Sequence, residues 1–179
     1  MTTIVNSHGK PLFRIGGDAK TISLNTPKGC VVVEDPPNSN MFYQDGWVDM
    51  PSQPSSNHIF EYDLKQWVDP RTIEQVKEQK WAEIKSLRDQ LEFSGFEFEG
   101  DLYDSDQVSQ GRIMGAASAQ IDQTWTLANN ETVDLTAIQL SQLYQSLQLH
   151  IANTHERGRI ARQLIYEATS IEQVEQITL

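Results

Sequence analysis

The side chains best suited to acid–base or anion-binding chemistry are the histidines and arginines near the C-terminal end of the chain. His150 and His155 are five residues apart in a stretch with helical periodicity, so they point to different faces. A helical metal pair needs a spacing of three or four residues, and no histidine metal site is therefore predicted here. With the arginines that follow, these histidines form a basic cluster. The cluster either binds an anionic ligand or pairs with acidic side chains of the same chain.

A concentration of negative charge lies between Glu97 and Asp106. The spacing of its aspartates does not match a calcium-binding loop, which places oxygen ligands at alternate positions and a glutamate at the twelfth. Asp104 and Asp106 instead suit the cap and first turn of a helix. Because an acidic loop in a compact domain attracts cations, we expect an internal ion-pair cluster. Its predicted members are Asp104, Asp106, His155, Arg157, Arg159 and Arg162.

Motifs for nucleophilic catalysis or nucleotide binding do not occur. The sequence contains no G-x-S-x-G, no P-loop and no G-x-G-x-x-G. The single cysteine, Cys30, follows Gly29 and precedes three valines, which indicates a thiol in the core of a strand rather than a nucleophile. A lone cysteine cannot form an intramolecular disulfide. We therefore expect no enzymatic activity, no bound metal and no cofactor.

The overall charge of the chain argues against two classes of binding partner, nucleic acids and anionic membranes. The 179 residues include 14 Lys and Arg against 25 Asp and Glu, which gives a net charge of −11. Such an acidic chain is poorly suited to a nucleic-acid groove, which needs basic side chains to displace counterions, or to an anionic membrane surface. The apolar runs are too short to span a bilayer, and the first residues show no secretory signal. Neither nucleic acid nor membrane is expected as a partner.

The elements that would position these residues change character near Pro70. Residues 1–69 contain six of the seven prolines, most of the turn signals and several short β-favouring runs. We predict strands at 30–33, 41–43, 47–48, 58–62 and 66–68, with Asp45-Gly46 as a two-residue hairpin turn. Aromatic side chains in this module either contact a partner or fill its small core. The candidates for interaction are Tyr43, Trp47, Tyr62 and Trp67.

Residues 70–179 have the periodicity of a mainly helical domain. A first helix is expected from an Asp69 cap, with Pro70 in its first position, to about Phe93. Two β-hairpins are predicted near 96–103 and 125–135, with a helix between them from residue 104 or 105 to about 121. Thr136 then opens a capping box for the longest helix, which reaches about residue 168, and a short helix follows. The predicted fold class is α+β, with a small N-terminal antiparallel β module (1–69) before the helical domain (70–179).

The longest predicted helix carries a seven-residue repeat of apolar and small side chains. The members step alternately by four and three residues. They are Leu140, Tyr144, Leu147, Ile151, Thr154, Gly158, Ala161 and Ile165. Such a stripe either packs within its own domain or forms a seam between subunits, and the spacing alone leaves both alternatives open. The candidate interaction residues on it are Tyr144, Leu147 and Ile151.

Several stretches occur in an order and spacing that resemble a known family. YQDGWV (43–48), HIF (58–60) and QWVDPRT (66–72) resemble the amino-terminal module of phage tail-fibre and tail-fibre-assembly proteins. KWAEIK (80–85), YDSD (103–106), RIMGAA (112–117), WTL (125–127), HER (155–157) and EATSIE (167–172) are similar to the carboxy-terminal domain of unknown function that is common in phage tail proteins. Together these stretches cover nearly the whole chain.

The resemblance implies a non-enzymatic product of a tailed phage or prophage, since no catalytic residues are recognised in this family. Two roles follow from it. The protein is part of, or attached to, the tail fibre of the host-recognition apparatus, with the β module serving docking or fibre attachment. Alternatively, it is an assembly chaperone that binds the distal fibre during trimerisation. The implied partners are other phage tail or fibre proteins, the implied oligomer is a trimer, and the implied location is the virion tail, after synthesis in the host cytoplasm.

Overall fold

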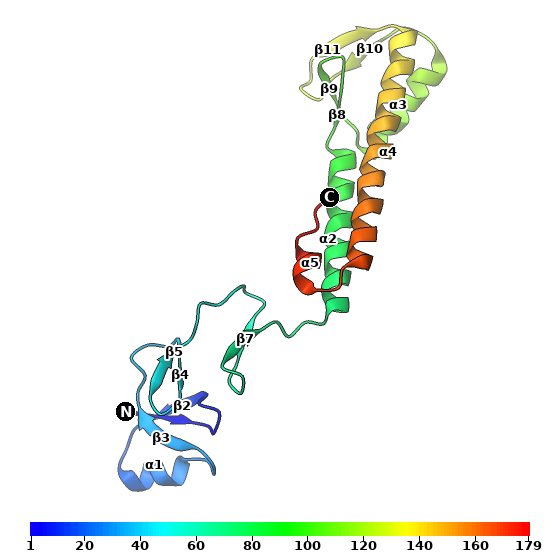
Figure 1. The fold of residues 1–179 in the computed structure, drawn as a ribbon. Helices are drawn as coiled ribbons and strands as arrows, with labels where there is room; N and C mark the ends of the chain where they lie inside the picture. The colour runs from blue at the N-terminus through cyan, green and yellow to red at the C-terminus, as the bar shows by residue number, and fades with distance from the viewer. The chain divides into compact units, whose positions relative to one another are not determined.

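The computed structural model describes residues 1–179, and the chain divides into two compact units, Met1–Pro70 and Arg71–Leu179. Figure 1 shows short antiparallel strand pairs in both units and long helices only in the second. The fold class is α+β, as predicted.

The first unit is built on a three-stranded antiparallel sheet that the sequence patterns did not reveal in full. Its order is β2 (Pro11–Ile15), β1 (Thr2–Val5) and β3 (Val31–Glu34). The central strand β1 is the buried one, with Ile4 and Val5 fully covered. A seven-residue helix, α1 (Ala19–Asn25), connects β2 to β3 and has no buried residue, so it lacks the apolar periodicity that would have predicted it.

Two hairpins complete the first unit at the predicted places. They are β4 (Met41–Tyr43) with β5 (Trp47–Asp49), and β6 (Ile59–Glu61) with β7 (Gln66–Val68). Tyr43 pairs with Trp47, so the β4–β5 loop has three residues rather than the predicted two-residue turn. Asp45 takes a left-handed φ of 55° in that loop, which aspartate tolerates better than most residues. Cys30 is also corrected, because it precedes β3 and is partly exposed instead of lying in a strand core.

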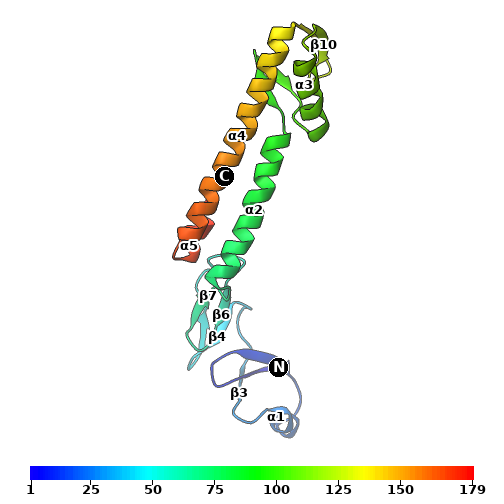
Figure 2. The ribbon, with the colours of Figure 1, turned by 90° about the vertical axis from the view of Figure 1, so that its right-hand side faces the viewer.

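The second unit has a stem of two long antiparallel helices, α2 (Ile73–Phe93) and α4 (Ala137–Glu167) (Figures 1 and 2). A short helix, α5 (Ile171–Glu175), packs against α2. The α2 cap is Thr72, not Asp69, because Thr72 and Gln75 form a capping box that satisfies two backbone donors at once. The predicted capping box at Thr136 is confirmed. No helix of the chain is both long enough and apolar enough to cross a membrane.

The apolar and small stripe of α4 packs within its own unit. Leu140, Leu147 and Ala161 are almost completely buried, and a Cβ added at Gly158 would lie 3.1 Å from Cδ of Arg88 on α2. Tyr144 and Ile151 are partly buried against the same core. These placements favour the intrachain alternative. Leu147 cannot contact a partner unless this core opens, which corrects its assignment as an interaction residue.

The distal part of the second unit, residues 94–150, is called the head. It holds the hairpin β8 (Phe96–Phe98) and β9 (Asp101–Tyr103), helix α3 (Gln107–Ala119), the hairpin β10 (Gln123–Thr126) and β11 (Thr132–Leu135), and the first half of α4. α3 begins after an Asp106 cap, slightly later than predicted. One apolar core joins these elements: Phe96, Tyr103, Ile113, Ala116, Leu127, Leu135, Leu140, Leu143 and Leu147.

Candidate functional site

A groove of about 490 Å³ lies in the head between α3 and β10. The helix side is formed by Ser109, Arg112, Gly115 and Ala116, and Asp104 and Asn130 also contribute to the wall. The strand side is formed by five consecutive residues, 123–127. Successive side chains of a strand point to opposite faces, so a wall of five consecutive residues is the edge of the strand. The backbone of β10 therefore borders the groove.

The register of the hairpin shows which backbone groups of β10 are open. The Leu127 N–H donates to the carbonyl of Glu131 at 2.8 Å, which makes this a hydrogen-bonded pair. Antiparallel pairs alternate, so Trp125 with Val133 is the next hydrogen-bonded pair. Thr124 and Thr126, between these positions, direct their N–H and C=O groups away from β11. Both residues line the groove.

A neighbouring strand covers this edge only at its end. The N–H of Ala128 donates to the carbonyl of Leu102 in β9 at 3.0 Å. After Tyr103 the chain leaves the strand direction, because Asp106 caps α3 through the N–H groups of Val108 and Ser109. Strand pairing therefore stops beside Ala128, and the outward groups of Thr126 and Thr124 stay unpaired above the groove.

The charged side chains that line the groove are Arg112 and Asp104. No hydrogen bond or ion pair engages the guanidinium of Arg112 or the carboxylate of Asp104, whereas Asp106 is fully used as a cap. The pKa of Asp106 is lowered from its ordinary value by the Ser109 hydroxyl, then by the backbone N–H groups of Ser109 and Val108, and least by the charge of Arg112. Arg112 is the only Lys or Arg among residues 94–150, which contain eight Asp and Glu residues.

This arrangement suits recognition of a ligand that forms hydrogen bonds. The volume of the groove lies within the range of ligand pockets, and its wall is rich in polar groups. The strand edge supplies one N–H donor and one C=O acceptor at each open residue. Arg112 supplies a guanidinium group that can donate two parallel hydrogen bonds to a carboxylate.

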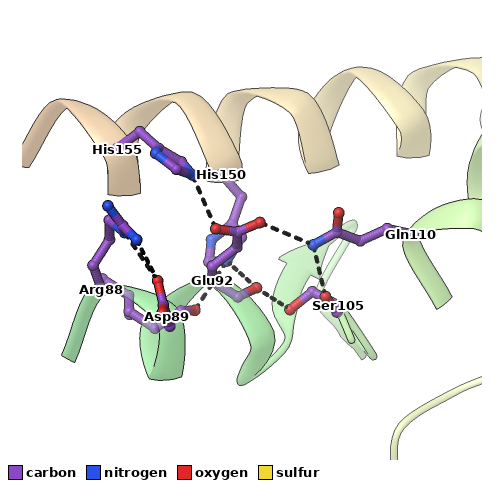
Figure 3. A network of polar contacts seen from close by, with 8 residues as sticks. Arg88, Asp89, Glu92, Ser105, Gln110, His150 and His155 are labelled. Carbon is purple, nitrogen blue, oxygen red and sulfur yellow. Dashed lines mark hydrogen bonds and ion pairs between the residues drawn. The ribbon is translucent and has the colours of Figure 1, made fainter. Parts of the chain in front are cut away.

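A polar network between the end of α2 and the head holds the segment that begins α3 (Figure 3). The buried Ser105 hydroxyl donates to the Glu92 carbonyl at 2.5 Å and accepts from the Gly95 N–H at 2.9 Å. The Gln110 amide donates to the Glu92 carboxylate at 3.3 Å and to the Ser105 carbonyl at 2.9 Å. These bonds satisfy backbone groups at the end of α2 and tie them to α3.

Two histidines of α4 close the network from the other side (Figure 3). Nε2 of His150 lies 3.1 Å from the carbonyl of Leu91 and 3.2 Å from that of Glu92. Both neighbours are acceptors, so we assign the proton to Nε2. His155 contacts the carboxylate of Glu92 at 3.0 Å. The stem and the head are thus joined by polar contacts as well as by the apolar core.

The predicted ion-pair cluster does not form. Asp106 is a helix cap and Asp104 lines the groove, while the basic residues lie further along α4 in the stem. A helix rises about 1.5 Å per residue, which carries the arginines away from the acidic hairpin. Their partners are local ones: His155 contacts Glu92, Arg157 donates to the Leu179 carbonyl, Arg159 pairs with Glu156, and Arg162 lies over the Trp81 ring.

The candidate aromatic residues of the first unit lie partly buried and contact one another or neighbouring rings. Tyr43 and Trp47 pack edge to face with ring centroids 5.4 Å apart, and Tyr62 and Trp67 both pack on Phe60. Each indole N–H is used inside the unit: that of Trp47 donates to the Glu34 carbonyl at 2.8 Å, and that of Trp67 to the Pro51 carbonyl at 2.7 Å. Burial raises the pKa of Tyr62. These contacts favour the core-filling alternative.

The groove residues Arg112, Thr124 and Thr126 were not singled out from the sequence. One signal was available, since Arg112 is the sole basic residue in a long acidic stretch. The open edge had no such signal, because it depends on where β9 stops pairing.

Comparison with known proteins adds one finding. The family model described as a domain of unknown function, DUF4376, matches residues 75–178, which include most of the stem, the whole head and the groove. No curated protein and no solved structure matches the chain. Because the match spans more than half of the sequence, the chain belongs to the DUF4376 family.

Proposed function

We propose that this is a non-enzymatic phage tail protein, either part of the tail fibre or attached to it. The observation that carries the proposal is the ordered resemblance to phage tail proteins, which runs through both units rather than through the DUF4376 region alone. In this role its partners are other tail or fibre proteins, its location is the virion tail, and a trimer is the expected oligomer.

The geometry supports a role in binding polypeptide. The sheet of the first unit has two outer strands, β2 and β3, each paired on one side only. The groove of the second unit presents unpaired backbone groups beside an unpaired arginine. At an outer strand or an open strand edge, a strand of a partner protein can pair with this chain through backbone hydrogen bonds.

The second candidate function, a tail-fibre assembly chaperone, is favoured by the same open edge of β10. A chaperone must hold a fibre chain before its strands find their final partners. A short strand edge with two unpaired residues can bind such a chain reversibly, because few hydrogen bonds form.

Quantitative mass spectrometry of gradient-purified virions distinguishes the two roles. A tail component is expected at a fixed ratio to the major tail protein. A chaperone is expected to be absent from virions, and its deletion should abolish fibre trimers on native gels. Absence from virions combined with normal fibre trimers in the deletion strain would contradict both roles.

A further inference from the structure

We infer that the groove between α3 and β10 binds an extended segment of another polypeptide, which adds as a strand to β10 and places one carboxylate on Arg112. The chemistry of this site does not depend on whether the protein is carried on virions. It follows from three properties of the groove, which are its open strand edge, its unpaired cation and its shape.

The open edge determines the conformation of the ligand. Thr124 and Thr126 each offer one N–H and one C=O toward the groove, because their neighbours in the ladder use theirs to pair with β11. Only a backbone in β conformation presents donors and acceptors with the same repeat. A segment of about four residues spans both positions. It would continue the pairing that the carbonyl of Leu102 begins at Ala128.

The charge of the groove determines the chemistry of the segment. Arg112 lines the groove with no hydrogen bond or ion pair, so a carboxylate of the ligand can take up its donors. The surrounding head has eight acidic residues and no other Lys or Arg, so a second negative charge would be repelled. The fitting segment carries one Asp, Glu or C-terminal carboxylate among neutral or basic residues.

The shape of the groove supplies a matched pair of test variants. A Cβ added at Gly115 meets no atom within 4 Å, and Gly115 lines the groove. Gly115→Leu should therefore place an apolar side chain in the groove and obstruct a bound segment, and, as a glycine replacement inside a helix, it should not weaken α3. Gly111 lies in the same helix with equally open space but does not line the groove, so Gly111→Leu is the control.

The experiment uses the full chain and a displayed library of random dodecapeptides. Peptides selected on the wild-type protein are synthesised, and their affinities are measured by fluorescence anisotropy. We expect equal binding to wild type and Gly111→Leu, and binding to Gly115→Leu that is weaker by at least about tenfold. Circular dichroism of both variants confirms that the helices are retained.

A double-mutant cycle tests the carboxylate contact. Arg112→Gln, and replacement of the peptide carboxylate by its amide, should each weaken binding about tenfold, with no further loss when combined. Recovery of no peptide, or of peptides that bind wild type and Gly115→Leu equally, would overturn the inference. Selected peptides that lack a carboxylate, or whose two losses simply add, would remove Arg112 from the site and contradict the inference as stated.

Discussion

Replacing Ser105 by alanine tests whether the network in Figure 3 holds the head on the stem. The Ser105 side chain is fully buried, and its hydroxyl accepts a hydrogen bond from the Gly95 N–H at 2.9 Å. The Glu92 carbonyl keeps the contact with Nε2 of His150 at 3.2 Å when the hydroxyl is removed. The loss is therefore one hydrogen bond plus one poorly satisfied donor, about 2 kcal/mol of unfolding free energy.

The assay is equilibrium unfolding in urea, followed by far-UV circular dichroism at the helical minimum, which reports mainly the second unit. Ser118→Ala is the matched control, because the exposed Ser118 hydroxyl bonds only the Met114 carbonyl of its own helix. It should change the unfolding free energy by less than about 0.5 kcal/mol. If Ser105→Ala were as mild as this control, the network would not be holding the end of α2.

Three further substitutions probe the core, the α3 cap and a turn. Leu147→Ala should lower the unfolding free energy by about 3 kcal/mol, whereas Ile138→Ala, at a site 72% exposed on the same helix, should change it little. If the stripe were a seam between subunits, light scattering would instead show that Leu147→Ala converts an oligomer to monomers. Because the pKa of Asp106 is lowered in the folded protein, its ionised carboxylate stabilises the fold fully at pH values above its ordinary pKa of 3.8, and this contribution is lost as the pH falls through the folded pKa. The difference in unfolding free energy between wild type and Asp106→Asn should therefore shrink as the pH is lowered in acid. A difference that did not change with pH would show that the charge is unimportant. Gly95→Ala should lower the unfolding free energy more than Gly100→Ala. Both glycines have a left-handed φ, but only at Gly95 would an added Cβ come close to a neighbouring atom, the Tyr103 carbonyl oxygen at 3.0 Å. Equal losses in urea unfolding would argue against that contact.

The elements that the sequence predicted correctly are those with local signals. Thr136 and Gln139 form their capping box within four residues, and the stripe on α4 repeats within one helix. The misplaced cap at Asp69 shows the limit of such signals. Asp69-Pro70 and Thr72 are both acceptable helix starts, and the reciprocal bonds with Gln75 decide between them.

The features that could not be predicted from the sequence depend on contacts between residues far apart in the chain. β1 joins residues near position 2 to residues near positions 15 and 34, and neither outer strand has strict apolar–polar alternation. The ion-pair cluster failed for a related reason, because the length of α4 separates His155 and Arg162 from the acidic hairpin. The groove forms from α3, β10 and the loops beside them, which meet only in the folded head, so the isolated charge of Arg112 could not be assigned to a site from the sequence.

Amide hydrogen exchange followed by NMR tests most directly whether the edge of β10 is open for strand addition. The Leu127 N–H is bonded to Glu131, and the ladder places Trp125 against Val133, so both amides should exchange slowly. The amides of Thr124 and Thr126 should exchange rapidly in the free protein and become protected when a selected peptide binds. Slow exchange of Thr124 and Thr126 in the free protein would show that the edge is already occupied and would contradict the account.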